Sequence, residues 1–299
     1  MTSMKKSISD KCSKAWAYIA FVLPGTFLYV LFVLFPFFGG TVVTSFTKWS
    51  PLKRSSFWVG LKNYQDIWTN EKFLASFSVT IRYMLVVVII TNLLGLLVAL
   101  LIEGLKRGKS LFRNVYFIPY IISPYLGGFI WLFMFTAVYP EIIGKLGWAN
   151  LDISWFGNDV SAFWAVSIVT IWQQLGFIVV MYIAGLQTVP QDILEASLID
   201  GATGWQQKIY ITIPAISNVI TINLFLSITN AFRQFDIIYA MTKGGPGYAT
   251  RVTTMDIYMT AFSDQDYGLA CAKAVVFMAM IVVITFLQLK LTSRKEVEV

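Results

Sequence analysis

The chain has 299 residues, of which 57% are hydrophobic and only 13% are charged, and its formal net charge is +7. Soluble domains carry about a quarter charged residues, so this composition argues against a water-soluble fold. The basic residues lie beside apolar stretches rather than along one amphipathic face, which argues against nucleic-acid binding. Cys12 and Cys271 are far apart and there is no histidine, so the sequence predicts no metal site and no disulfide framework.

Six apolar stretches are long enough to cross a bilayer, which takes about 20 residues of helix. They are residues 15–47, 83–102, 114–140, 160–191, 209–232 and 267–289, and the first five contain no charged residue. Core helices of soluble proteins rarely lack charge on every face over such a length. We therefore expect an all-α polytopic membrane protein with six transmembrane helices. Lys273 interrupts the sixth stretch near one end, where we expect its side chain to reach the lipid headgroups or a carboxylate.

The charges outside these stretches indicate an orientation. The short loop 103–113 carries four basic residues, and such residues gather in short cytoplasmic loops, so we expect both termini in the cytoplasm. The opposite loop 48–82 also holds basic residues. The charges favour this orientation only because basic residues are more densely spaced on the side of the termini. The first stretch is too long for a signal peptide, and we expect it to stay attached. The expected organisation is a cytoplasmic segment 1–14, a six-helix membrane domain 15–290 and a cytoplasmic tail 291–299.

Residues 188–214, between the fourth and fifth stretches, predict two short helices that meet at a turn. Thr188 with Gln191, and Thr203 with Gln206, have the spacing of a capping box, in which the threonine accepts from a backbone N–H three residues on. Gly201 supplies the break between the helices, since glycine readily adopts the left-handed conformation at helix ends. We call this segment the elbow.

We expect the elbow to expose two carboxylates and a set of apolar side chains: Ile193, Leu194, Leu198, Ile199 and Trp205. Such a surface suits docking into a groove on a partner protein. An amphipathic connector that rests on lipid headgroups would have the same composition.

The elbow resembles the EAA motif of ATP-binding-cassette importer permeases, which reads Glu-Ala-Ala, three residues, Gly, nine residues, Ile, one residue, Leu-Pro. The matching residues are Glu195, Gly201, Ile211 and Pro214, while Ser197 replaces the second alanine and Ile213 replaces the leucine. Further stretches resemble the carbohydrate-uptake group related to maltose permeases: residues 186–190, 200–202, 242–246 and 258–262, together with Thr250.

This resemblance covers roughly residues 15–290 and implies the type I importer permease fold. It implies that the elbow is the coupling helix, which sits in a cleft of a cytoplasmic ATPase and carries its motion into the membrane. The coupling residues so implied are Glu195, Ala196, Ser197, Asp200, Gly201, Ala202 and Trp205.

The implied partners are a second, similar permease, two cytoplasmic ATPase subunits and an extracytoplasmic solute-binding protein, assembled at a bacterial or archaeal cytoplasmic membrane. The sequence contains no phosphate-binding loop of the Gly-x-x-x-x-Gly-Lys-Ser/Thr type. We therefore expect ATP and Mg²⁺ on the ATPase partners, no cofactor on this chain and no enzymatic activity of its own. Nucleic acid is not an expected partner.

Polar side chains inside a membrane span are costly, so they are candidates for a substrate pathway. The fifth stretch carries four that fall on one helical face: Asn223, Ser227, Asn230 and Gln234. This face can bind a substrate, or it can tie the helix to a neighbouring helix.

The third and fourth stretches add further candidates. Trp172, Gln173 and Gln174 place an aromatic ring beside two amides, which suits the apolar face and the hydroxyl rim of a sugar. Tyr120, with Ser123 and Tyr125, can contribute to the pathway or belong to the aromatic belt at the membrane interface.

The family resemblance implies sugar-contacting roles for Trp172, Ser227 and Gln234. It places Ala231 where relatives have an amide, so it does not carry over the identity of the sugar. The glycine-rich residues 244–247 follow no strand, so we expect them to shape a surface for the binding protein rather than a phosphate site.

The sequence thus predicts a permease subunit of an importer for a sugar or oligosaccharide. The residues do not decide against an importer of the same kind that transports glycerol phosphate, a polyol or another polar solute. An ion-coupled secondary transporter would need buried carboxylates or paired broken helices, and a membrane-embedded enzyme would need an acid–base pair. Apart from Lys273, the spans contain no charged residue, which argues against both.

Overall fold

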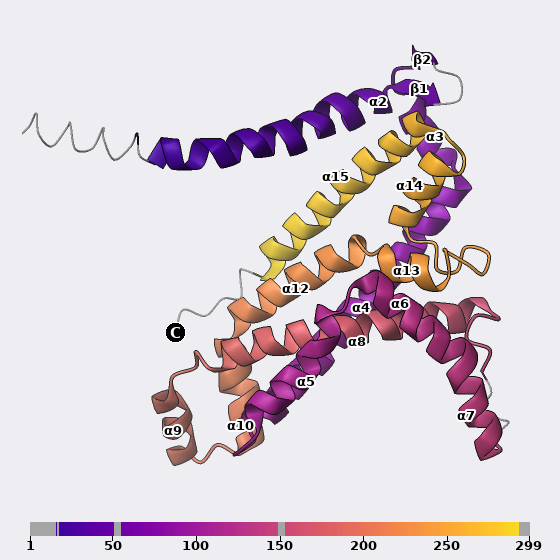
Figure 1. The fold of residues 1–299 in the computed structure, drawn as a ribbon. Coiled ribbons are helices and arrows are strands. Elements are labelled where there is room, and N and C mark those ends of the chain that lie inside the picture. The colour runs from indigo at the N-terminus through magenta and orange to yellow at the C-terminus, as the bar shows by residue number, and fades with distance from the viewer. Residues whose placement is uncertain (1–15, 17, 51–54, 149–152, 293–299) are drawn as a thin grey trace, which may run out of the picture. The chain divides into compact units, whose positions relative to one another are not determined.

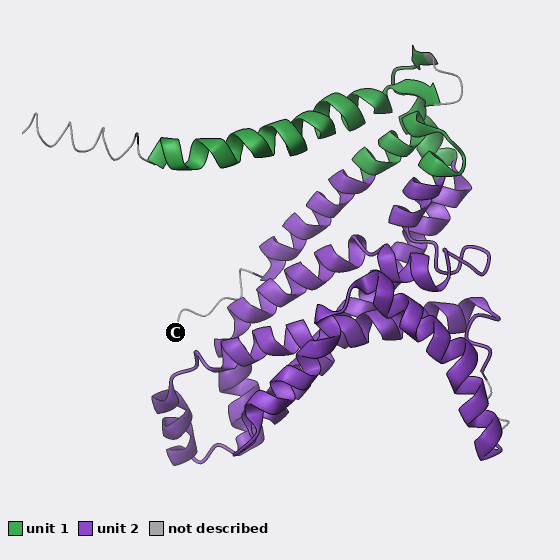
Figure 2. Ribbon diagram, viewed as in Figure 1, with its two compact units in different colours: residues 1–69, 260–276 green, residues 70–259, 277–299 purple. Residues whose placement is uncertain are grey.

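The computed structural model describes residues 16, 18–50, 55–148 and 153–292, and the regular structure there is almost entirely helical (Figure 1). The chain divides into two compact units (Figure 2). Unit 1 comprises residues 1–69 and 260–276, and unit 2 comprises residues 70–259 and 277–299. The expected segment 1–14 and residues 293–299 of the expected tail 291–299 lie outside the described residues.

Unit 1 begins with the long apolar helix Tyr18–Ser45, which includes the wide π-helical turns η1 (Val30–Leu34) and η2 (Pro36–Val42) and ends in α2 (Val43–Ser45). Pro36 opens η2, and because proline has no N–H to donate it favours such a local widening. A two-stranded antiparallel hairpin follows, β1 (Thr47–Ser50) with β2 (Ser55–Trp58), and then α3 (Lys62–Thr69). Within the described residues, this hairpin is the departure from the expected all-α fold.

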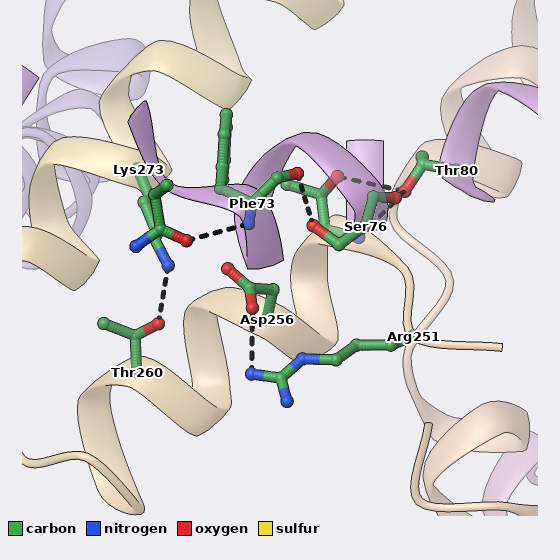
Figure 3. Close-up of polar contacts among 9 residues, drawn as sticks. Phe73, Ser76, Thr80, Arg251, Asp256, Thr260 and Lys273 are labelled. Atoms are coloured by element: carbon green, nitrogen blue, oxygen red, sulfur yellow. Dashed lines mark hydrogen bonds and ion pairs between the residues drawn. The ribbon is translucent and has the colours of Figure 1, made fainter. Parts of the chain in front are cut away.

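The side chain of Asn63 ties these pieces together. Its Nδ2 donates to the carbonyl oxygens of Ser45 at 2.8 Å and Thr47 at 2.9 Å, so α3 is fixed to the end of the first span and the start of β1. Unit 1 also contains the buried Lys273, whose Nζ donates to Thr260 Oγ1 at 2.9 Å (Figure 3). The expectation that Lys273 reaches the headgroups is therefore wrong, because a hydroxyl partner is available beside it.

The centre of unit 2 is the pair α4 (Glu71–Glu103) and α8 (Asp159–Leu186), which pack against each other along much of their length (Figure 1). Helix α5 (Lys109–Ile121) packs on α8, and α12 (Ser217–Phe232) packs on α4. Glycines permit the close contacts. A β-carbon on Gly176 would overlap the carbonyl oxygen of Tyr116 on α5, and one on Gly95 would lie 2.6 Å from Ile178 Cγ2.

The third apolar stretch is not one continuous helix. Helix α5 ends at Ile121, and an extended Ile122 and Ser123 separate it from α6 (Pro124–Phe133), η4 (Met134–Val138) and α7 (Tyr139–Leu146). A residue before proline is sterically disfavoured in the α conformation, so Pro124 places the break. The membrane-length helix is therefore Pro124–Leu146, shifted toward the C-terminus from the expected 114–140.

The fifth stretch is also broken. The segment Gly204–Ala215, which contains α10 (Gly204–Gln207), η6 (Lys208–Thr212) and α11 (Ile213–Ala215), meets α12 at an angle of 68°. The described helices thus include five long enough to span a membrane, and six when this bent pair is one span, in agreement with the expected six. The remaining helices are α9 (Gln191–Ile199), α13 (Asp236–Met241), α14 (Thr253–Phe262) and α15 (Tyr267–Thr292). Because α15 runs through Thr292, the first two residues of the expected tail 291–299 are helical.

Candidate functional site

The first arm of the elbow, α9, ends in a Schellman turn. Gly201 has φ +82°, its N–H donates to the carbonyl oxygen of Leu198 at 3.1 Å, and the N–H of Ala202 donates to that of Ser197 at 3.0 Å. These two bonds satisfy carbonyl groups that the end of a helix leaves unpaired. A side chain at position 201 would be strained, because L-residues rarely adopt positive φ. The predicted break at this glycine is confirmed.

The second arm begins with a complete capping box. The N–H of Thr203 donates to Gln206 Oε1 at 2.8 Å, and the N–H of Gln206 donates to Thr203 Oγ1 at 3.3 Å. The capping box predicted at Thr188 is wrong. The Thr188 hydroxyl donates back to the carbonyl oxygen of Gly185 at 2.8 Å, and α9 starts after Pro190 without a side-chain cap.

A side-chain clamp joins the two arms of the elbow. Gln207 Nε2 donates to the carbonyl oxygen of Leu194 at 2.7 Å and to Ser197 Oγ at 2.8 Å. The Ser197 hydroxyl itself donates to the carbonyl oxygen of Leu194 at 2.7 Å. Ser197 replaces an alanine of the motif, and nothing local in the sequence marks Gln207 as its partner. An alanine at position 197 would remove one of the two oxygen atoms that Gln207 binds.

The elbow carries an exposed apolar tip on a buried base. The exposed fractions of Ile199, Trp205 and Leu198 are 87%, 66% and 57%. Glu195, Ala196 and Asp200 are also exposed, whereas Ala202 is half-buried. Leu194, expected to be exposed, instead packs on a core cluster that includes Ile102, Ile183, Leu186, Val189 and Ile216. The tip is therefore held rigidly on the membrane helices and remains free to enter a groove.

A hollow of about 300 Å³ borders the turn on its second arm. Its lining is Asp200, Gly201, Ala202, Gln206, Tyr210 and Ile211. The protruding apolar side chains and the small hollow beside them give the elbow a shape that a complementary protein surface can match.

The predicted polar stripe of the fifth span is shorter than its spacing suggested. Helix α12 ends at Phe232, so Gln234 lies beyond it. Ser227 is buried and accepts from Asn92 Nδ2 of α4 at 3.0 Å, and Asn92 in turn accepts from the Tyr182 hydroxyl of α8 at 3.0 Å. Asn223 is fully buried beside Tyr182, and its amide makes no hydrogen bond of ordinary length to a described residue. This part of the stripe therefore faces other helices.

The C-terminal part of the stripe is less buried. Asn230 and Gln234 are half-buried, and the Gln234 Nε2 atom makes no hydrogen bond with any residue that the structure describes. The Gln234 carbonyl oxygen accepts from Thr254 Oγ1 at 2.6 Å, which fixes the backbone there to α14. The buried Gln234 Nε2 atom therefore keeps an unused hydrogen-bond donor among the described residues.

The pathway candidates on α5 and α8 also divide by burial. One is buried and bonded to the protein, and the others are half-buried or exposed. Gln173 is buried, and its Nε2 donates to the carbonyl oxygen of Ile122 at 2.8 Å, so it satisfies the break between α5 and α6. Trp172 is half-buried and meets Trp131 edge-on, with ring centroids 5.4 Å apart. Gln174 is half-buried, and Tyr120 is exposed and stacked on Phe177 at a centroid distance of 5.0 Å.

An aromatic cluster near the end of α12 was not predicted as a unit, although Tyr125 was a pathway candidate and Tyr258 belongs to a stretch that resembles maltose permeases. It consists of Tyr125, Phe235, Tyr239 and Tyr258, contributed by α6, α13, α14 and the α12–α13 turn, with neighbouring centroids 5.2 to 6.3 Å apart. A hydrogen bond with Tyr239 raises the pKa of Tyr258 above its usual value. Tyr125 lies far from the other three members in the sequence, and those three come from a turn and two separate helices, so no local spacing reveals the cluster.

The glycine-rich loop after α13 is held by polar contacts. The hydroxyls of Thr242 and Thr250 share a hydrogen bond of 2.7 Å, and Thr250 also donates to the carbonyl oxygen of Gly245 at 2.8 Å. Arg251 closes the loop with an ion pair to the fully buried Asp256, 2.8 Å between Nη2 and Oδ1 (Figure 3). A buried carboxylate is stable only when paired, so this contact fixes the loop on α14.

Comparison with known proteins identifies the chain. The family model described as "Binding-protein-dependent transport system inner membrane component" matches residues 91–297, which include the elbow. The chain belongs to this family. It is the permease subunit of an ATP-binding-cassette importer, an integral membrane protein with a transport role rather than an enzymatic one.

Two relatives and one solved structure cover the permease almost completely. It is 35% identical to the probable starch degradation products transport system permease protein AmyD of Thermoanaerobacterium thermosulfurigenes, over 94% of this chain and 95% of the relative. It is 31% identical to the multiple sugar-binding transport system permease protein MsmF of Streptococcus mutans, over 97% and 100%. Its fold matches a chain of the bacterial alginate transporter solved in complex with an alginate pentasaccharide-bound periplasmic protein, with a TM-score of 0.81, 19% identity and coverage of 95% and 96%.

Proposed function

We propose that this permease imports a sugar or oligosaccharide handed over by an extracytoplasmic binding protein. The observation that carries the proposal is a set of aromatic rings and half-buried amides in unit 2: the aromatic cluster, with Gln234 directly before Phe235 in the sequence and Asn230 near the end of α12. Aromatic faces pack on the apolar faces of sugar rings, while amides bond the hydroxyl rims. The names of the two relatives, which refer to starch degradation products and to multiple sugars, support the same class of cargo.

In this proposal the polar residues divide into two groups. Trp172, Gln174, Asn230, Gln234 and Tyr120, which are half-buried or exposed, line the pathway. Gln173, Asn223 and Ser227, which are buried against other helices, hold the shape of the pathway.

The elbow is the proposed docking site for the ATPase. Its exposed tip, with Ile199 and Trp205, enters a cleft of a cytoplasmic ATPase subunit, and Glu195 and Asp200 add charges at the edge of the contact. A second, similar permease completes the pathway, two ATPase subunits bind ATP and Mg²⁺, and both termini of this chain lie in the cytoplasm of a bacterial or archaeal cell.

The cargo is tested first on the cognate binding protein. Thermal unfolding is followed with a panel of mono- and oligosaccharides and with glycerol 3-phosphate and polyols. A ligand at 100 times its Kd stabilises a protein by about 2.7 kcal/mol, so binding raises the unfolding midpoint. A shift only with glycerol 3-phosphate or a polyol would contradict the sugar proposal.

The pathway is tested with Asn230→Leu and Gln234→Leu in the assembled transporter. Both variants should lower sugar uptake while the complex assembles normally. Asn218→Leu is the matched control, because Asn218 is exposed on the first turn of the same helix. Loss of assembly in the first two variants would assign these amides to helix packing instead.

A further inference from the structure

A second hollow, of about 180 Å³, lies between the end of α4, the start of α5 and the end of α8. Its apolar floor comes from Ile102 and Ile183, which belong to the core cluster that supports Leu194 of the elbow. The membrane-length helices Glu71–Glu103 and Asp159–Leu186 both end here. The hollow therefore opens at the depth where a bilayer has its headgroups.

The polar lining of this hollow contains a carboxylate oxygen without a hydrogen bond and a guanidinium without an ion pair, both judged among the described residues. Lys109 Nζ lies 2.7 Å from Glu103 Oε1, but Glu103 Oε2 is buried and accepts no hydrogen bond from any described residue. Arg113, one helical turn after Lys109, makes no ion pair with the residues that the structure describes. A carboxylate oxygen of this kind favours a cationic donor, and a guanidinium favours a phosphate.

The two helices that carry these charged groups also expose apolar side chains. Leu101 on α4 and Leu111, Phe112 and Val115 on α5 have exposed fractions of 61%, 65%, 45% and 54%. A water-soluble ligand would gain nothing from these side chains, whereas the acyl chains of a lipid would cover them. Basic groups at the end of membrane helices are a recurrent feature of lipid headgroup sites.

We propose that this hollow binds the headgroup of an aminophospholipid, phosphatidylethanolamine. Its ammonium group donates to Glu103 Oε2, and its phosphate accepts from Arg113. Lys109 holds the Glu103 carboxylate in place through the other oxygen. Because the floor of the hollow and Leu194 share one core cluster, the bound lipid braces the base of the elbow.

The test is a lipid titration of the full chain in detergent, read by native mass spectrometry. Phosphatidylethanolamine, phosphatidylcholine and phosphatidylglycerol with identical acyl chains are compared. A trimethylated amine has no N–H to donate, and phosphatidylglycerol has no amine. One lost charge-assisted hydrogen bond corresponds to about a tenfold change in affinity, so we expect phosphatidylethanolamine to bind about tenfold more tightly than either.

Two variants and a matched control locate the site. Arg113→Gln should weaken binding of phosphatidylethanolamine about tenfold, and Glu103→Gln should remove its advantage over phosphatidylglycerol. Arg107→Gln should change nothing, because Arg107 lies in the same basic loop and does not line the hollow. If Glu103→Gln fails to fold, the lipid comparison and Arg113→Gln decide.

Three results would overturn the proposal. The first is equal affinity for the three lipids. The second is an equal loss with Arg107→Gln, which would indicate diffuse attraction to the basic loop. The third is displacement of the lipid by glycerophosphoethanolamine at equal concentration, which would indicate a site for a soluble phosphate ester rather than for a lipid.

Discussion

The clamp between the arms of the elbow leads to a quantitative prediction for Gln207→Leu. The change removes hydrogen bonds of 2.7 and 2.8 Å, while the Leu194 carbonyl oxygen keeps the Ser197 hydroxyl as a donor. Little desolvation penalty therefore remains, and two hydrogen bonds at the usual net value amount to about 1–2 kcal/mol of local stability. Local opening of the turn should become about 5- to 30-fold more frequent.

The assay is hydrogen exchange of the N–H groups of Gly201 and Ala202, whose acceptors lie on α9. Their exchange should accelerate by that factor, and uptake per ATP hydrolysed should fall, because a loose elbow transmits less of the partner's motion. Gln191→Leu is the matched control, since Gln191 is exposed and its side chain makes no hydrogen bond with the described residues. Unchanged exchange in Gln207→Leu would refute the clamp, and faster exchange with normal uptake would refute its part in coupling.

Three further changes test the packing and the caps. Gly176→Ala should lower the free energy of unfolding by about 1–3 kcal/mol, because its methyl group would overlap the backbone of α5. Gly144→Ala is the control, since Gly144 has open space around it, and it should leave the thermal midpoint in detergent unchanged. Thr203→Ala removes the capping box and should cost about 1 kcal/mol, seen as faster hydrogen exchange in the first turn of α10. Ser227→Ala leaves the Asn92 amide without one acceptor and should destabilise unit 2 by about 1–2 kcal/mol, so a normal unfolding midpoint would contradict the inter-helix contact.

The membrane helices could be predicted from the sequence because length and apolar character are local properties. The breaks within these helices were harder to predict from the sequence. The stretch 114–140 contains no charge, and only the position of Pro124 marks where α5 ends and α6 begins. The 68° bend before α12 follows Pro214 by two residues, and an apolar run gives no other sign of it.

The turn of the elbow was predictable for the same reason. A left-handed Gly201 and the capping pair Thr203 and Gln206 depend only on neighbouring residues. The clamp by Gln207 was not, since it depends on how two arms ten or more residues apart meet in space.

Side-chain environment was the least predictable property. Asn223, Ser227 and Gln234 have the spacing of one helical face, but their surroundings differ. Gln234 lies beyond the end of α12, and Ser227 accepts a hydrogen bond from Asn92 of α4. Lys273 likewise reads as an interfacial lysine by its position in the stretch, although a hydroxyl partner holds it in the interior. Such differences are set by tertiary packing, which the pattern along one helix does not contain.

The most direct test of an elbow that couples ATP hydrolysis to import is uptake by the complete transporter. Proteoliposomes carry the permease with its partner subunits, ATP inside and sugar-loaded binding protein outside. Wild-type uptake should require both ATP and the binding protein, and Glu195→Lys and Gly201→Asp should each abolish it in complexes that still assemble. Import at the wild-type rate by both variants would contradict the account.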